Sequence, residues 1–310
     1  MVDSPAPRKR KGERALAADM GWAETFIAVD WGTTNRRAWL IAGGTVEQEF
    51  EDGRGVLSVA KPDFPAAVAE VRERLGDHPM LMAGMIGSTR GWVEAAYVPC
   101  PAGLDEVAAA LTWAEPARTA IVPGLSNRDP PDVMRGEEVQ ILGAVAAGLI
   151  PANCIVCHPG THNKWAVVAD GKLARFRTVM TGEMFSLLKE HSILSDLLTD
   201  DMGIDEAFRA GVSQGVGGRA LTAELFSVRA GVLLGRRRTE DATDFTSGLL
   251  IGTDVAASLG EAGDGEVFVM GRPDLTRLYA AAIAIAGREA SEIDGEAAFL
   301  AGIKAIAGQT

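Results

Sequence analysis

The chain has 310 residues, of which 47% are hydrophobic and 23% are charged, and its formal net charge is −12. These proportions exclude general disorder and predict a folded protein of roughly two domains. The acidic balance, without a basic stripe interleaved with aromatic residues, argues against nucleic acid as a partner. No apolar run approaches the roughly 18 residues that a membrane span requires, so we expect no membrane partner either.

The amino-terminal segment, residues 1–24, is polar and carries a basic cluster between Arg8 and Arg14. It lacks the apolar region of a secretory signal, and we expect a disordered tail there. Three cysteines in a chain without such a signal predict no disulfide scaffold. We therefore expect a cytoplasmic protein.

Residues 25–150 predict a first α/β domain. Apolar runs separated by Gly-Thr and Gly-Gly turns predict three strands up to residue 50. Apolar periodicity then predicts helices over 64–75, 104–112 and 136–149 and strands over 79–84 and 118–124.

Residues 151–310 predict a second domain with a similar order of elements. A strand-turn-strand pattern covers 153–179 and is followed by a predicted helix. The segment 195–245 predicts a mostly helical insertion, and the remaining pattern predicts a helix over 246–260, a strand over 265–271 and a helix over 273–287.

The two halves share a turn. VDWGTTNRRAWL (29–40) matches CHPGTHNKWAVV (157–168) without a gap. The match places Gly32 on Gly160, Thr33 on Thr161, Asn35 on Asn163, Ala38 on Ala166 and the basic Arg36 on the basic Lys164. Because both turns stand in a strand-turn-strand context, duplication explains the match better than chance does. Two such turns facing each other would form a cleft.

The first turn has the residues of an anion and metal site. Asp30 ends a predicted strand and is followed by Gly32, Thr33 and Thr34. Glycine allows close approach of the backbone to phosphate, successive N–H groups form an anion nest, and a carboxylate can hold hydrated Mg²⁺. The alternative is a hairpin turn with polar caps. The second copy, with Gly160, Thr161, Asn163 and Lys164, favours binding of nucleotide phosphates.

Segment DWGTTNRRAWL resembles the first phosphate motif of the actin and hexokinase superfamily. Six blocks in order resemble the 2-dehydro-3-deoxygalactonokinase family from about residue 25 onward: VDWGTTNRRAWL, MAGMIGSTRGWVEAAYVPCPA, VMRGEEVQILGA, PGTHNKW, FRTVMTGE and SGLLIGTDVA. The resemblance implies an α/β fold of duplicated ribonuclease-H-like domains, each with a βββαβα core, and a cleft between them. It also implies transfer of phosphate from ATP, with Mg²⁺, to the 6-hydroxyl of 2-dehydro-3-deoxy-D-galactonate in galactonate catabolism.

Two acidic residues, Glu137 and Glu138, stand at a predicted helix start, where the helix dipole favours a carboxylate. The resemblance implies a general base at such a position, and we assign this role to Glu137 first and to Glu138 second. The alternative is a pair of solvated acids that only support the helix dipole.

An acidic sugar needs cationic partners, and the first-domain loops offer Arg36, Arg90 and Arg135 beside Asn35. Arg90 is the best carboxylate candidate because it lies in a Gly-bounded loop after a strand. Trp92 could stack on the ligand, although an aromatic residue there is more often core. A single surface arginine is more often merely solvated.

Strand-Gly-helix segment VFVMGRPDLTRLY resembles the place where this superfamily holds adenosine, which suggests Gly271, Arg272 and, further back, Gly252. Relatives often have two glycines where only Gly271 stands here. Helix packing is the alternative role of Gly252. His158 occupies the place of Asp30 in the second turn, so one copy lacks the metal-binding carboxylate.

Other readings are less well supported. The Cys154–Cys157–His158 spacing matches a haem-attachment pattern, but it lies in a predicted strand and no export signal is present. No P-loop motif is present. A kinase of this fold for another sugar or sugar acid, and a non-catalytic regulator, remain as alternatives, and a homodimer stays open.

Overall fold

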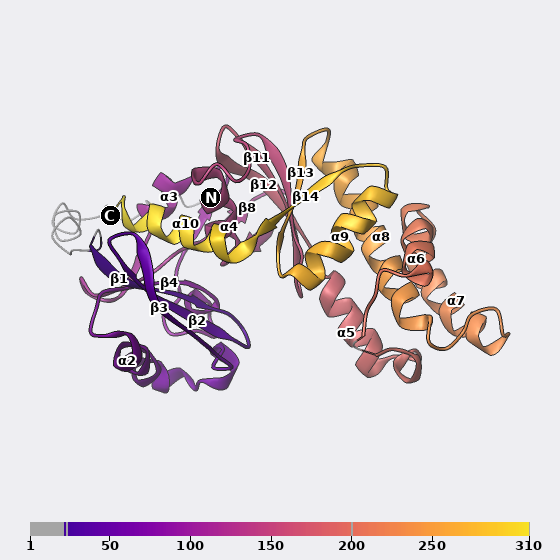
Figure 1. The fold of residues 1–310 in the computed structure, drawn as a ribbon, viewed down its shortest axis with the longest axis horizontal. Helices are drawn as coiled ribbons and strands as arrows, with labels where there is room; N and C mark the ends of the chain where they lie inside the picture. Colours follow the sequence, from indigo (N-terminus) through magenta and orange to yellow (C-terminus); the bar gives the residue numbers. More distant parts are fainter. Residues whose placement is uncertain (1–21, 23, 200, 310) are drawn as a thin grey trace, which may run out of the picture. The chain divides into compact units, whose positions relative to one another are not determined.

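The structure is a computed structural model that describes Trp22, residues 24–199 and residues 201–309 (Figure 1). The predicted disordered tail lies outside the described residues, apart from Trp22 and Glu24. The chain divides into two compact units. The first unit contains the described residues up to Ser126, together with Val133–Ala146 and the residues from Phe299 on, and the second contains Asn127–Asp132 and Ala147–Ala298.

A mixed sheet forms the centre of the first unit, with the order β3-β2-β1-β4-β7-β6. Strands β1, β2 and β3 form an antiparallel meander, β4 and β7 continue the sheet parallel to β1, and β6 closes it antiparallel to β7. The strands are β1 (Thr25–Trp31), β2 (Arg36–Ala42), β3 (Thr45–Asp52), β4 (Met80–Gly84), β6 (Thr112–Glu115) and β7 (Thr119–Ile121).

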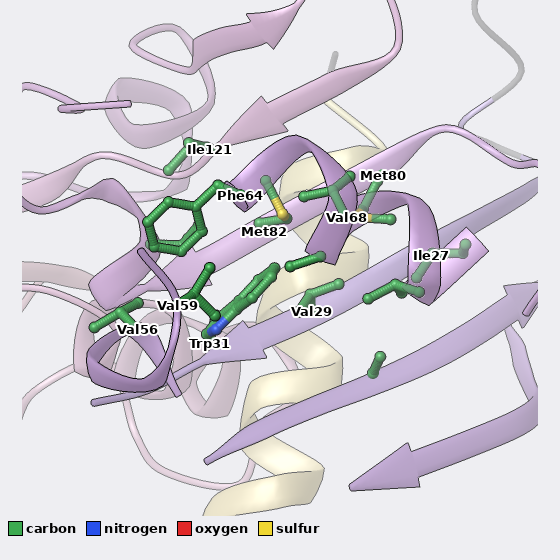
Figure 2. Close-up of a cluster of buried hydrophobic side chains, with 14 of the residues drawn as sticks. Ile27, Val29, Trp31, Val56, Val59, Phe64, Val68, Met80, Met82 and Ile121 are labelled. Carbon is green, nitrogen blue, oxygen red and sulfur yellow. The ribbon is translucent and has the colours of Figure 1, made fainter. Parts of the chain in front are cut away.

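One face of this sheet is covered by α2 (Phe64–Leu75). The apolar residues of α2 recur at helical spacing, a proline stands in its first turn, and Gly76 ends it with φ 95°. Figure 2 shows the resulting core, in which Trp31 and Val29 of β1 lie among Phe64, Val68 and Met82. Burial of this large apolar area is the main source of stability of the unit.

The opposite face carries two helices, α4 (Glu137–Ala146) and α10 (Gly295–Ala307). Trp39 of β2 packs against Phe299 of α10, with ring centroids 5.2 Å apart. A Cβ on Gly302 would lie 2.0 Å from the Val139 carbonyl oxygen, so α10 and α4 touch through their backbones. The unit also contains α3 (Leu104–Ala108), the 3-10 turns η1 (Val56–Ser58), η2 (Lys61–Asp63) and η3 (Met85–Gly87), and most of a small sheet of β5 (Tyr97–Pro99), β8 (Gly124–Asn127) and β9 (Asp132–Met134).

The second unit repeats the sheet, with the order β12-β11-β10-β13-β14. Its first three strands form an antiparallel meander, and β13 and β14 run parallel to β10. The strands are β10 (Cys154–His158), β11 (Asn163–Ala169), β12 (Lys172–Val179), β13 (Val267–Gly271) and β14 (Ala290–Asp294). Counted within each unit, the meander and its two parallel strands have the same order, which confirms the predicted duplicated ribonuclease-H-like fold.

Helices of the second unit pack on one face of its sheet (Figure 1). The helices that share the apolar core of the sheet are α6 (Glu206–Val216), α8 (Ala242–Ala262) and α9 (Pro273–Ile285). A separate apolar cluster joins α8 to α5 (Thr181–His191), η4 (Ser195–Leu197) and α7 (Leu221–Leu233). Cys157 and Trp165 of the sheet lie in one core with Val255 of α8 and Tyr279 of α9. In the part of the chain that the structure describes, no helix is long and apolar enough to cross a membrane.

Candidate active site

Three chain segments of the first unit converge beside Asp30, at the end of β1. Gly84 and Gly136 adopt φ values of 90° and 108°, which side chains disfavour. A Cβ on Gly84 would lie 2.8 Å from the Trp31 carbonyl oxygen and 3.4 Å from Asp30 Oδ1, and a Cβ on Gly136 would lie 3.3 Å from the Gly84 Cα. The two glycines therefore let the end of β1, the end of β4 and the start of α4 approach one another.

The two acids at the start of α4 have different surroundings. Glu138 is fully buried, its Oε2 accepts the Gly136 N–H at 2.7 Å, and its Oε1 has no hydrogen-bond partner. Burial, and next the charge of Glu137, raise the pKa of Glu138 to about 8. Glu137 is partly exposed and accepts the Arg135 N–H at 3.1 Å. At neutral pH Glu138 is thus mostly protonated, and Glu137 is the acid that solvent and a ligand can reach.

Between β1 and β2, the first turn is held from outside by the loop that follows β3. The carbonyl oxygens of Gly32, Thr33 and Thr34 accept N–H groups of Val56, Leu57 and Gly55. The side chains of Thr33, Thr34 and Asn35 remain exposed. Asp30 pairs with Arg37, with Oδ2 and Nη2 2.8 Å apart. The turn therefore has a fixed backbone and a polar surface.

The second turn, between β10 and β11, rests on the start of α5. Glu183 N–H donates to the Thr161 carbonyl at 2.9 Å, and a Cβ on Gly182 would lie 2.5 Å from the Gly160 carbonyl oxygen. Thr161 is exposed, whereas Lys164 is 5% exposed and its Nζ donates to the His162 carbonyl at 3.3 Å. A helix start and a glycine turn thus come together, an arrangement suited to anions.

The register of the two hairpins corrects the ungapped alignment by one residue in the second strand. Asp30 pairs with Arg37, but His158 pairs with Lys164. Lys164 is therefore the structural counterpart of Arg37, and Asn163 is the counterpart of Arg36. The cause is that the second hairpin has one residue fewer between the paired residues, five between His158 and Lys164 against six between Asp30 and Arg37.

Those two counterparts, Arg36 and Asn163, are both fully buried. Arg36 donates to both oxygens of Asp52, at 3.2 and 2.7 Å, and to the Ala67 carbonyl at 2.9 Å. The Asn163 amide donates to Asp254 at 2.8 Å. These contacts leave neither side chain a surface for a ligand, and we remove Arg36 from the candidate substrate residues in favour of a structural role.

A pocket of about 250 Å³ lies in the first unit. Arg135 is 8% exposed there, donates to the Ala95 carbonyl at 2.7 Å and lies 4.5 Å from the centre of the Tyr97 ring. Arg90 is exposed, and Trp92 packs against the core. The pocket is lined by Met85, Ser88, Thr89, Arg90, Glu94, Tyr97 and Arg135. Two guanidinium groups beside hydroxyls suit an anionic, hydroxylated ligand.

The predicted adenosine residues have different surroundings in the structure. Gly271, at φ 145°, ends β13 beside the second turn, and a Cβ there would lie 3.6 Å from the Pro159 carbonyl oxygen. Arg272 is exposed and pairs with Asp274 at 2.5 Å. Gly252 is buried against α6, where a Cβ would lie 2.4 Å from the Val212 carbonyl oxygen, which accounts for the glycine by helix packing.

Comparison with known proteins decides the family. The model of the 2-keto-3-deoxy-galactonokinase family matches residues 30–306. The chain belongs to this family. It is 38% identical to the 2-dehydro-3-deoxygalactonokinase of Escherichia coli K12, over 91% of this chain and 97% of that protein.

Two further relatives carry the same enzyme name. A Rhizobium meliloti protein named "Probable 2-dehydro-3-deoxygalactonokinase DgoK1" is 38% identical over 93% of this chain and 98% of its own. A crystal structure from Sinorhizobium meliloti, of a protein provisionally given the same enzyme name, has a TM-score of 0.85 and 37% identity, covering 91% of this chain and 98% of that one. The resemblance predicted from the six sequence blocks is confirmed.

Sequence reasoning missed Gly84 and Gly136 as parts of the site, and it missed Asp254. Gly84 is the last residue of a predicted strand and Gly136 is the first residue of a predicted helix, positions at which a conformational role could have been anticipated. Asp254 lies inside a helix, and the sequence contains no signal that it would face a distant turn.

Proposed function

We propose that the protein transfers the γ-phosphate of ATP to the 6-hydroxyl of 2-dehydro-3-deoxy-D-galactonate. The observation that carries this proposal is the approach of Asp30 and the acidic start of α4 across Gly84 and Gly136, in a chain of this kinase family. Phosphoryl transfer depends on positioning and on neutralisation of charge; the carboxylate of Asp30 would contribute to neutralisation through a bound Mg²⁺ ion.

Asp30 is our candidate for holding Mg²⁺. Its carboxylate is of the right chemical type, and the side chain is 18% exposed. Among the described residues no group of three or more His, Cys, Asp or Glu side chains could hold a metal ion. A single carboxylate fits Mg²⁺, because this ion keeps several waters and is commonly shared with substrate phosphates. When bound, the ion would neutralise phosphate charge.

Glu137 is our candidate for the general base that accepts the proton of the attacking hydroxyl. It is partly exposed, whereas Glu138 is buried and mostly protonated at neutral pH. We assign Glu138 the role of a neutral neighbour that limits the negative charge at the helix start.

Arg135 and Arg90 are our candidates for binding the substrate carboxylate, with the pocket that they line as the sugar-acid site. Asn35 stays a prediction, since its amide donates to Glu51 at 3.1 Å on the exposed first turn. Trp92 stays a prediction with core packing as its observed contact.

Each of the two turns is by itself our candidate for binding nucleotide phosphates. The first turn offers Gly32, Thr33 and Thr34, and the second offers Gly160, Thr161 and the backbone around Asn163 and Lys164. Gly271 and Arg272 remain candidates for adenosine. The cytoplasmic location and the homodimer stay predictions.

Release of ADP by the purified protein tests the function. The acceptors are 2-dehydro-3-deoxygalactonate, its C4 epimer 2-dehydro-3-deoxygluconate and neutral hexoses, each with and without Mg²⁺. We expect Mg²⁺-dependent turnover with the galactonate derivative and at most weak turnover with the others. Turnover with a neutral hexose alone would assign a different substrate, and tight ATP binding without any turnover would favour a regulator.

A further inference from the structure

Asp254 of α8 is buried, with 3% of its surface exposed, and its carboxyl group accepts five hydrogen bonds. Its Oδ2 accepts from Asn163 Nδ2 at 2.8 Å, from Thr181 Oγ1 at 2.6 Å and from Tyr279 OH at 2.8 Å. Its Oδ1 accepts from Trp165 Nε1 at 2.9 Å and from Ser258 Oγ at 3.1 Å. Three elements besides α8 thus meet on one carboxyl group: β11, α5 and α9.

The donors define this group as an acceptor. The Trp165 indole can only donate, and the Asn163 amide donates through its nitrogen. Burial, and next the Asp254 carboxylate, raise the pKa of Tyr279 well above its usual range, so the phenol keeps its proton. In the described part of the chain Asp254 has no ion pair, and hydrogen bonds alone compensate for its burial. Such a group is costly to bury, and a well-packed apolar core would be a cheaper solution for stability alone.

The contacts of Oδ2 and Oδ1 differ in what they hold. Asn163 is the first residue of β11, directly after the second turn, and Thr181 is the first residue of α5. The turn and the start of α5 touch through the Glu183 N–H and the Gly182 Cα. Through Asn163, Oδ2 is therefore bonded to the residue that follows the turn, and through Thr181 it is bonded to the first residue of the helix that contacts the turn. Oδ1 contacts Trp165 and Ser258, which lie within the core and within α8 itself.

We propose that Asp254 is a positioning residue for the nucleotide, which sets the distance between the Gly160–His162 turn and the start of α5 through Asn163 and Thr181. This inference rests on the assignment of the second turn to nucleotide phosphates. Asp254 does not touch the ligand in this account. Its contribution reaches the phosphates through backbone N–H groups that it keeps in place.

Paired variants separate positioning from stability. Thr181→Val removes one hydrogen bond from Oδ2 with almost no change in side-chain shape. Ser258→Ala removes one hydrogen bond from Oδ1 of the same carboxylate and is the matched control. We expect both to lower the melting temperature by similar amounts, because each removes one buried hydrogen bond. We expect only Thr181→Val to raise the KM for ATP, by roughly tenfold or more, with the KM for the sugar acid unchanged.

Asp254→Asn is the second variant, in case Thr181→Val does not fold. It keeps the shape of the side chain but replaces one acceptor oxygen with an NH₂ group, which would face groups that themselves donate hydrogen bonds. We expect the same selective rise in the KM for ATP. Thr181→Ser, which restores the hydroxyl, should return the KM to the wild-type value. Equal KM values for ATP in Thr181→Val and Ser258→Ala, or rises in both substrates' KM in Asp254→Asn, would overturn the inference. Failure of the proposed function is seen separately, as absence of turnover in the wild-type protein.

Discussion

The two hairpins of the molecule share a scaffold and differ in the chemistry at its edge. In each, the first residue of the second strand is a fully buried polar side chain that ties the hairpin to the helical layer, Arg36 to Asp52 and α2, Asn163 to Asp254 of α8. On the other face, the first hairpin carries the ion pair of Asp30 and Arg37 at its paired strand ends. The second hairpin carries His158 and the buried Lys164 at the same place. The duplication thus kept a buried polar anchor and changed the charge at the strand ends.

This difference leads us to assign different functions to the two hairpins. The carboxylate of the first copy stands beside the acidic start of α4, where we place Mg²⁺ and the general base. The second copy has no carboxylate at the matching place and rests on a helix start, where we place phosphates. Changes that exchange or remove these features test whether the two copies have different tasks.

Among changes at the acidic start of α4, Glu137→Gln should lower turnover the most. The amide cannot accept the hydroxyl proton, and we expect kcat to fall by about 10²- to 10⁴-fold, as is usual when a general base is lost. The melting temperature should stay close to that of the wild type, because Glu137 is partly exposed. Glu138→Gln is the control, since that carboxyl is mostly protonated at pH 7. Turnover reduced more by Glu138→Gln than by Glu137→Gln would exchange their roles.

Arg36→Met should break the anchor of the first hairpin. Removal of one partner leaves the Asp52 carboxylate without its bidentate partner, and loss of a buried ion pair costs about 3–5 kcal/mol. Because Asp52 keeps a partly exposed side chain and a contact from Arg74, we expect the lower end of that range. Urea unfolding measures the loss. An unchanged free energy of unfolding together with a raised KM for the sugar acid would restore Arg36 as a substrate ligand.

The pH dependence of stability should show the buried Glu138. Its pKa lies at about 8 in the folded protein and near its ordinary value of 4.5 in the unfolded chain. The folded state therefore retains the proton more strongly, and the free energy of unfolding falls as the pH rises between these two values. Each unit of pKa difference corresponds to about 1.4 kcal/mol. Glu138→Gln should flatten this fall between pH 5 and pH 8, and an identical pH profile in both proteins would contradict the burial of an ionisable group.

The sequence predicted those features that neighbouring residues determine. Alternating apolar residues and Gly-Thr turns predicted both hairpins, and the acidic helix start identified Glu137 and Glu138. The six blocks identified the family. The last strand and helix, β14 and α10, were not predicted, because ASEID has few apolar residues and four of its five side chains are charged or small.

Features that depend on distant contacts could not be predicted. The burial of Arg36 depends on α2, and the burial of Asn163 depends on Asp254, 91 residues away in the chain. The one-residue shift between the hairpins depends on the pairing of β11 with β10, which an ungapped alignment does not represent. Gly84 and Gly136 lie close together in the fold, but α3 and the strands from β5 to β9 stand between them in the chain.

The most direct test of the different tasks of the two copies is the Mg²⁺ dependence of turnover in Asp30→Asn and His158→Asn, each compared with the wild-type protein. Asp30 and Arg37 form a partly exposed ion pair, so its loss should cost at most about 1 kcal/mol of stability. The account predicts that Asp30→Asn lowers kcat by orders of magnitude and raises the Mg²⁺ concentration needed for half-maximal turnover, while His158→Asn leaves that concentration unchanged. Equal Mg²⁺ requirements in Asp30→Asn and the wild type, or a shift in His158→Asn alone, would contradict it.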